Sequence, residues 1–171
     1  MITIRLATSE DADALPSIEQ SAGLAFRAIP ELAWLADGEN VGPERHRALI
    51  AQGACFVAAD DRGRPIGFLS AAAEGDTLHI WELDVHLDWQ GRGIGRALLD
   101  AAIERARSLG FVALTLTTFR DVEWNAPFYR KAGFRTLNAD EMDHRLATLL
   151  GEEASHGMPS ERRCAMRLDL D

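Results

Sequence analysis

The sequence predicts a mixed α/β fold in a single domain, residues 1–171. Segments with strand-like alternation and segments with helical periodicity follow one another along the whole chain. Three strand segments in the middle of the chain are separated only by short polar turns, which is typical of antiparallel neighbours. No linker rich in Ser, Gly or Pro divides the 171 residues, and this length suits one domain.

The first third of the chain is predicted to contain one strand and three helical segments. Apolar residues at every second position predict the strand: Ile2, Ile4 and Leu6. Thr8 and Asp11 have the spacing of a capping box, so we expect a helix from there to about Phe26. A short helix with a loop is expected over 30–42, and a second clear helix over 44–52.

The rest of the chain is predicted to alternate between strands and helices. The three turn-linked strands come first: Cys55–Ala59, Ile66–Ala73 and Leu78–His86. A helix with an apolar stripe follows over 93–109 and stops at Gly110. The remaining elements are a strand over 111–117, a short helix over 125–131, a brief strand over 134–137, a helix that begins with the capping residues Asn138 and Glu141, and a last strand over 164–170.

Composition and charge exclude several kinds of protein. Cys55 and Cys164 each lie in an apolar run, so neither a disulfide framework nor a metal site is expected, and His46, His86, His144 and His156 show no ligand spacing. The chain has no leader-like start and no run of about 18 apolar residues, which predicts a cytoplasmic protein with no membrane partner. A net charge of −9 argues against nucleic acid and is compatible with a cationic substrate.

A glycine-rich turn between a strand and a helix carries the clearest chemical signal. Gln90-Gly91-Arg92-Gly93-Ile94-Gly95 follows the strand residues Leu83-Asp84-Val85 and opens the next helix. Glycines let the backbone approach a phosphate, which the first helical N–H groups attract, and Arg92 and Arg96 can add charge. A P-loop would need GK[ST], and a dinucleotide-dependent oxidoreductase would need GxGxxG in an N-terminal parallel unit, so both are disfavoured.

The strand end Leu83-x-Val85 with Gln90-x-x-Gly93-x-Gly95 resembles the acetyl-CoA-binding motif of the GNAT N-acetyltransferase family. A second segment, from Asn125 through Tyr129 to Gly133-Phe134, is similar to that family's Y-x-x-x-G-F hallmark. The order of the predicted elements follows the family along nearly the whole chain. The resemblance implies a central mixed, mostly antiparallel sheet of about seven strands with helices on both faces.

The resemblance also implies a cofactor site for acetyl-CoA as cosubstrate, with no metal. The residues implied in binding lie in the two motifs: Leu83, Asp84, Val85, Gln90, Gly91, Arg92, Gly93, Ile94, Gly95, Arg96, Asn125 and Tyr129. Where the family usually has an asparagine, seven residues before the tyrosine, this chain has Val122, and Asn125 lies only four residues before it.

The implied reaction is a direct attack by an amine on the thioester in a ternary complex. Backbone N–H groups near Leu83–Val85 would polarise the carbonyl, and Tyr129, the only tyrosine, fills the position of the general acid. The general base stays open between His79, Glu82 and a water relay. Strand alternation places His79 and Trp81 on one face and Ile80, Glu82 and Asp84 on the other, although a bulge of the kind frequent in this family would change that parity.

For the acceptor site, four aromatic residues are candidates for a common wall: Trp34, Trp81, Phe119 and Trp124. Acidic residues close to Trp34 in sequence favour a cationic amine with an apolar body, and a small-molecule amine is favoured over a protein amine. A catalytically silent acetyl-CoA-binding regulatory module of the same fold is the alternative. A homodimer is compatible with the family by analogy alone.

Overall fold

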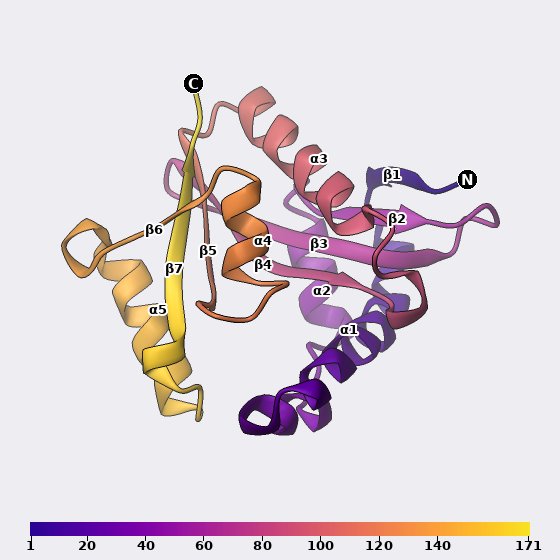
Figure 1. Ribbon diagram of the computed structural model, residues 1–171. Helices are drawn as coiled ribbons and strands as arrows, with labels where there is room; N and C mark the ends of the chain where they lie inside the picture. The colour runs from indigo at the N-terminus through magenta and orange to yellow at the C-terminus, as the bar shows by residue number, and fades with distance from the viewer.

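The computed structural model describes residues 1–171 and contains one seven-stranded sheet (Figure 1). Its strands are β1 Thr3–Leu6, β2 Phe56–Ala59, β3 Pro65–Glu74, β4 Thr77–Val85, β5 Ala113–Phe119, β6 Arg135–Thr136 and β7 Arg163–Asp169. They lie in the order β1-β2-β3-β4-β5-β7-β6, and only the pair β4–β5 is parallel. The expected mixed, mostly antiparallel sheet is therefore confirmed, and the last strand completes the chain's own sheet.

Helices cover both faces of this sheet (Figure 1). They are α1 Leu15–Gly23, α2 Pro43–Ile50, α3 Ile94–Ser108, α4 Ala126–Lys131 and α5 His144–Ser155. Neighbouring strand residues point to opposite faces: Leu69 joins the core under α3 and α4, whereas Phe68 joins the core under α1 and α2. None of the helices has the length and the apolar character that crossing a bilayer requires.

Two predicted helices begin differently from expectation. The Thr8–Asp11 capping box is present, but it starts a 3₁₀ helix over Ser9–Ala14, and α-helical geometry begins only at Leu15. Pro16 has no N–H group, so the α-helical hydrogen-bond pattern cannot extend back through it. The helix then returns to 3₁₀ geometry at Leu24–Ala28.

The capping box at Asn138 likewise starts only a short 3₁₀ turn over Ala139–Glu141. Met142 is extended, and α5 has its own cap, Asp143, whose carboxylate accepts a hydrogen bond from the Leu146 N–H at 2.8 Å. The helix predicted to begin at Asn138 therefore begins at His144.

Strands β4 and β5 separate after a short paired stretch. Thr77–His79 pair with Ala113–Thr115, and beyond that point β4 keeps only β3 as a neighbour. A gap consequently opens between the carboxyl-terminal halves of β4 and β5, in the middle of the sheet.

A β-bulge in β4 reverses the side-chain parity at this gap. Ser70 pairs with Glu82 and Ala71 with Ile80, so Trp81 is the extra residue. Ile80 and Leu83 both join the core under α3, and Glu82 shares the opposite face with His79. The simple alternation expected from the sequence, with Ile80 and Glu82 on one face, is wrong.

Candidate active site

A groove with a volume of about 350 Å³ lies beside the carboxyl-terminal half of β4, where the glycine-rich turn and α4 also line it. It is lined by many of the predicted cofactor-binding residues: Leu83, Val85, Gln90, Gly91, Gly93, Ile94, Gly95, Arg96 and Tyr129. Ala22, Trp89, Trp124 and Phe128 complete the lining and were not assigned to the cofactor from the sequence. Asp84, Arg92 and Asn125 are the predicted cofactor residues that do not line it.

The glycine-rich turn has a backbone built to receive an anion. Gly91 and Gly93 have φ angles of 75° and 79°, a left-handed conformation that favours glycine. The backbone N–H groups of residues 91–96 donate to no acceptor within the chain. Free donors at the start of a 15-residue helix fit a pyrophosphate, so this structure suits the nucleotide end of acetyl-CoA.

The polar side chains around the turn are mostly engaged with the protein. The Gln90 amide donates to the Val85 carbonyl at 3.0 Å and ties the turn to the end of β4. Arg92 lies over the Trp89 ring at 4.8 Å, and Arg96 pairs with Asp100 at 2.9 Å. The Asn125 side chain makes no hydrogen bond within the chain.

Tyr129 closes the groove from α4. Its ring packs edge-on against Phe128 and Phe134, while its hydroxyl has no hydrogen-bond partner in the chain. Burial, and then the charges of Asp84 and Glu82, raise the pKa of Tyr129. The phenol therefore stays protonated at neutral pH and is free to donate.

Three carboxylates form a cluster on the other side of β4. Oxygens of Glu19, Glu82 and Asp84, here called the carboxylate cluster, lie within 4.8 Å of one another. Burial first, and the neighbouring carboxylates second, raise the pKa values of Glu82 and Asp84. Burial also raises the pKa of Glu19, although its carboxylate accepts a hydrogen bond from the Val41 N–H at 2.7 Å. These groups hold protons at a higher pH than ordinary carboxylic acids do.

Sequence reasoning missed Glu19. One signal for it was available in the sequence. Glu19 lies four positions after Leu15 and one after Ile18, and this spacing places its charge on the apolar stripe of the helix. A carboxylate on a buried stripe needs either a partner or a function.

His79 lies apart from the carboxylate cluster, toward β5. It is 1% exposed, and its Nδ1 is 2.8 Å from the Thr115 hydroxyl. Burial first and the charge of Arg145 second lower the pKa of His79 to about 3. The imidazole is therefore neutral and weakly basic.

The four aromatic acceptor candidates do not form one wall. Phe119 is buried and, like the half-exposed Trp124, packs on Phe26. Trp124 lines the same groove as Tyr129 and the glycine-rich turn, which is the groove predicted to bind the cofactor. Trp81 packs instead against His79, with the Arg45 guanidinium 5.8 Å from its ring centre, and Trp34 lies exposed beside Gly157.

A sheet whose parallel pair splays beside a glycine-rich anion site suits the binding of a phosphate-bearing cofactor. Residues 24–134 match the family model described as "Acetyltransferase (GNAT) family". The chain belongs to the GNAT acetyltransferase family. The family and the fold expected from the sequence are thereby confirmed.

Curated relatives are similar over about half of this chain. A mycothiol acetyltransferase from Propionibacterium freudenreichii is 37% identical over 89 residues, which cover 50% of this chain and 28% of that protein. The peptidyl-lysine N-acetyltransferase YjaB of Escherichia coli is 28% identical over 97 residues, or 57% of this chain and 60% of that protein. The matched region thus spans less than two thirds of either relative.

Solved structures share the fold over nearly the whole chain. The PaiA N-acetyltransferase of Thermoplasma acidophilum, in complex with coenzyme A, has a TM-score of 0.73 at 17% identity and covers 99% of both chains. YncA, a putative acetyltransferase from Salmonella typhimurium with its cofactor acetyl-CoA, has a TM-score of 0.68 at 22% identity, covering 99% of this chain and 94% of that one.

Proposed function

We propose that the chain transfers an acetyl group from acetyl-CoA to a primary amine by direct attack in a ternary complex. One observation carries this proposal: an unpartnered phenol, Tyr129, lies in the groove close enough to Glu82 and Asp84 for their charges to raise its pKa. A proton donor and proton acceptors thus flank the gap between β4 and β5.

Each part of the site has a role in this reaction. Acetyl-CoA, when bound, supplies the thioester that the amine attacks. The free N–H groups of residues 91–96 hold the anionic end of the cofactor. Beyond His79 the backbone of β4 has no partner on the β5 side, so its N–H groups there are available to polarise the thioester carbonyl. As the C–N bond forms and the C–S bond breaks, the amine proton passes to a carboxylate and the Tyr129 hydroxyl protonates the departing thiolate.

Glu82, within the carboxylate cluster, is the general base we propose, in preference to His79. A free alkylamine has a pKa near 10 and is neutral in about one molecule in a thousand at pH 7. A carboxylate whose pKa is raised accepts such a proton more readily than an ordinary one. His79, with a pKa of about 3 and its Nδ1 engaged with Thr115, is a much weaker base.

A small-molecule amine is the acceptor we propose. Two packed regions restrict access to the side of the site where the acceptor would bind. Phe26 and Leu32 pack against Phe119, and α5 packs against β7. A small amine fits such a restricted site more easily than a protein does. The peptidyl-lysine activity in the name of YjaB makes a protein amine the competing acceptor.

Thiol release from acetyl-CoA, followed with Ellman's reagent across a panel of small amines, amino acids and lysine peptides, tests this proposal. Turnover with small amines that Tyr129→Phe strongly reduces is the expected result. If calorimetry shows acetyl-CoA bound while no amine discharges it, the silent binding module replaces the enzyme. Turnover restricted to lysine peptides would overturn the small-molecule acceptor only.

A further inference from the structure

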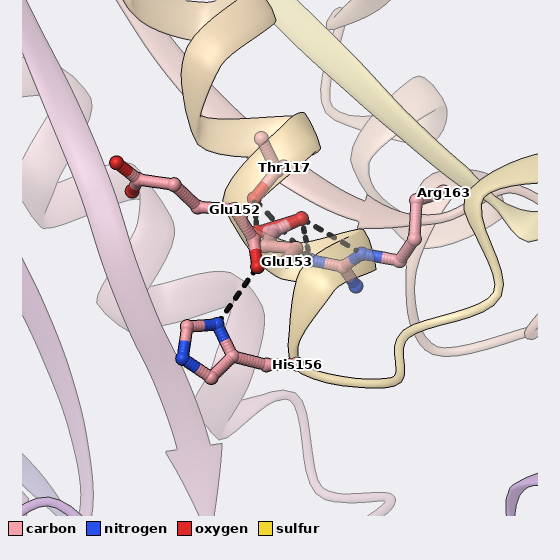
Figure 2. Close-up of polar contacts among 5 residues, drawn as sticks. All are labelled: Thr117, Glu152, Glu153, His156 and Arg163. Carbon is pink, nitrogen blue, oxygen red and sulfur yellow. Dashed lines mark hydrogen bonds and ion pairs between the residues drawn. The ribbon is translucent and has the colours of Figure 1, made fainter.

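A buried ion pair lies between α5 and the carboxyl end of β5 (Figure 2). The Arg163 guanidinium of β7 donates to the Glu153 carboxylate of α5 at 3.0 Å, and both side chains are less than one-fifth exposed. The Thr117 hydroxyl of β5 donates to the same carboxylate at 2.7 Å and accepts a hydrogen bond from Arg163 at 3.2 Å. Arg163 also lies over the Phe119 ring at 4.6 Å. Taking two charges out of water costs free energy that apolar packing would avoid, so stability alone does not account for this pair.

The pair lies on the same face of the sheet as Glu82. Leu116 joins the core under α3, so its neighbours on β5, Thr115 and Thr117, point to the opposite face. His79 contacts Thr115 on that face at 2.8 Å, and the bulge places Glu82 there as well.

Glu82 and Thr117 face each other across the gap between β4 and β5. His79 is the last residue of β4 that pairs with β5, opposite Thr115. Thr117 lies two residues further along β5, and Glu82 lies at the corresponding place on β4 once the extra residue of the bulge is counted. Arg163, which is hydrogen-bonded to Thr117, therefore faces Glu82 from the β5 side.

The charges around Glu82 come from three elements. Burial first, and then the charges of Asp84 on β4 and Glu19 on α1, raise the pKa of Glu82. The positive charge of Arg163 on β7 lowers it. Tyr129 of α4 is also close to Glu82 and is a neutral phenol. Arg163 is thus a cation that opposes the raised basicity of Glu82.

We propose that Glu153 is a positioning residue for the acetyl transfer: it holds the Arg163 guanidinium at β5, neutralises its charge, and so leaves Glu82 without a cationic partner and available as the base. Arg163 forms its ion pair with Glu153 and not with the carboxylate cluster. A carboxylate that pairs with an arginine is a weaker base, because its ionised form is stabilised. This inference rests on the proposed function, because Glu153 acts through the base of that reaction.

The test begins with Glu153→Gln, which keeps the shape of the side chain and leaves the Arg163 charge unbalanced. The pKa of Glu82 should fall, so the acidic limb of the kcat/KM profile should move to lower pH by about one unit. The value of kcat should fall as well, because a weaker base accepts the amine proton less readily. Thiol release from acetyl-CoA, measured between about pH 5 and pH 9, reports both effects.

Arg163→Gln is the second variant, and it should have the opposite effect. It removes the cation and leaves the Glu153 carboxylate, so the acidic limb should move to higher pH. A merely structural contact between α5 and the sheet would not move the limb in opposite directions in the two variants. The double variant, with no charge at either position, should return the limb close to its wild-type place. If one single variant fails to fold, the other still tests the direction of the shift.

Glu104→Gln is the matched control. It also leaves an arginine unpaired, Arg107, which lies 2.7 Å from Glu104 on the exposed face of α3. This control should leave the acidic limb and the thermal stability unchanged. Glu153→Gln should lower the thermal stability, because it leaves a buried guanidinium without its charged partner.

The outcomes separate the two proposals. An acidic limb that stays in place in both single variants, or that moves in the same direction in both, overturns the role of Glu153 and leaves the acetyltransferase intact. Failure of every amine to be acetylated overturns the proposed function, and the role of Glu153 with it.

Discussion

At the scale of single residues, Tyr129 is the group whose role is most directly testable. Replacement of Tyr129 by Phe removes only a hydroxyl that has no partner in the chain, so folding and cofactor binding should be preserved. We expect kcat to fall about 100-fold or more, the usual contribution of a general acid. Steady-state kinetics and calorimetric titration with coenzyme A measure the two effects. A kcat within about twofold of wild type would remove Tyr129 from the proton-transfer step.

The carboxylate cluster predicts a particular change in pH dependence. Asp84→Asn removes a negative neighbour that raises the pKa of Glu82, so the pKa of Glu82 should fall. If Glu82 is the base, the acidic limb of the kcat/KM profile then moves to lower pH. Asp88→Asn, the same change at an exposed carboxylate outside the cluster, should leave the limb in place.

The same profile distinguishes the alternative base. If His79 accepted the amine proton, His79→Gln would abolish the acidic limb and Asp84→Asn would barely shift it. A profile that neither variant changes would favour the water relay.

At the scale of elements, the turn before α3 combines left-handed glycines with free backbone donors. Gly93→Ala should cost about 1–2 kcal/mol of stability, because a φ of 79° disfavours a Cβ atom even though none of the surroundings would clash with it. Coenzyme A binding should also weaken, about tenfold, because the N–H groups of the turn are displaced. Chemical denaturation and calorimetry report the two quantities separately.

Gly63→Ala is the matched control for that variant. Gly63 has the same φ of 79°, equally open surroundings and a place in the distant β2–β3 turn. It should lose similar stability and keep its affinity for coenzyme A. An equal loss of affinity in both variants would show that Gly93 acts through global stability rather than through the anion site.

Most elements and the glycine-rich turn were predictable because their signals are local. Period-two alternation, glycine stops and capping residues are read within a few positions, and they placed β2, β3, β4 and α3 to within about two residues. The bulge at Trp81 was not readable in this way, since register depends on the partner strand β3. The carboxylate cluster was not predicted for the same reason, because Glu19 and Glu82 come together only in the folded chain.

At the scale of the whole molecule, a buried histidine makes stability depend on pH. His46 of α2 is fully buried against Phe68, and neither ring nitrogen has a partner in the chain. Burial first and the Arg45 charge second lower the pKa of His46 below its unfolded value. Its neutral form therefore supports folding above about pH 6.5, and stability is lost as the pH falls toward the folded-state pKa, by at most about 1.4 kcal/mol per pH unit.

Replacement by an apolar residue should remove that dependence. His46→Leu should gain stability relative to wild type as the pH falls from 7 to 5, measured by urea denaturation at each pH. A stability difference that does not change with pH would show that the His46 ring is hydrated or paired in solution.

The position of β7 has a consequence for how the protein is made. Residues 163–169 are synthesised after every other strand, yet they pair with β5 over seven positions and are the only partner of the two-residue β6. Until β7 has paired, the chain exposes the whole outer edge of β5, a template for pairing with other chains. A premature stop codon just before this strand would therefore yield an aggregation-prone product, although every residue assigned to the cofactor groove had already been translated.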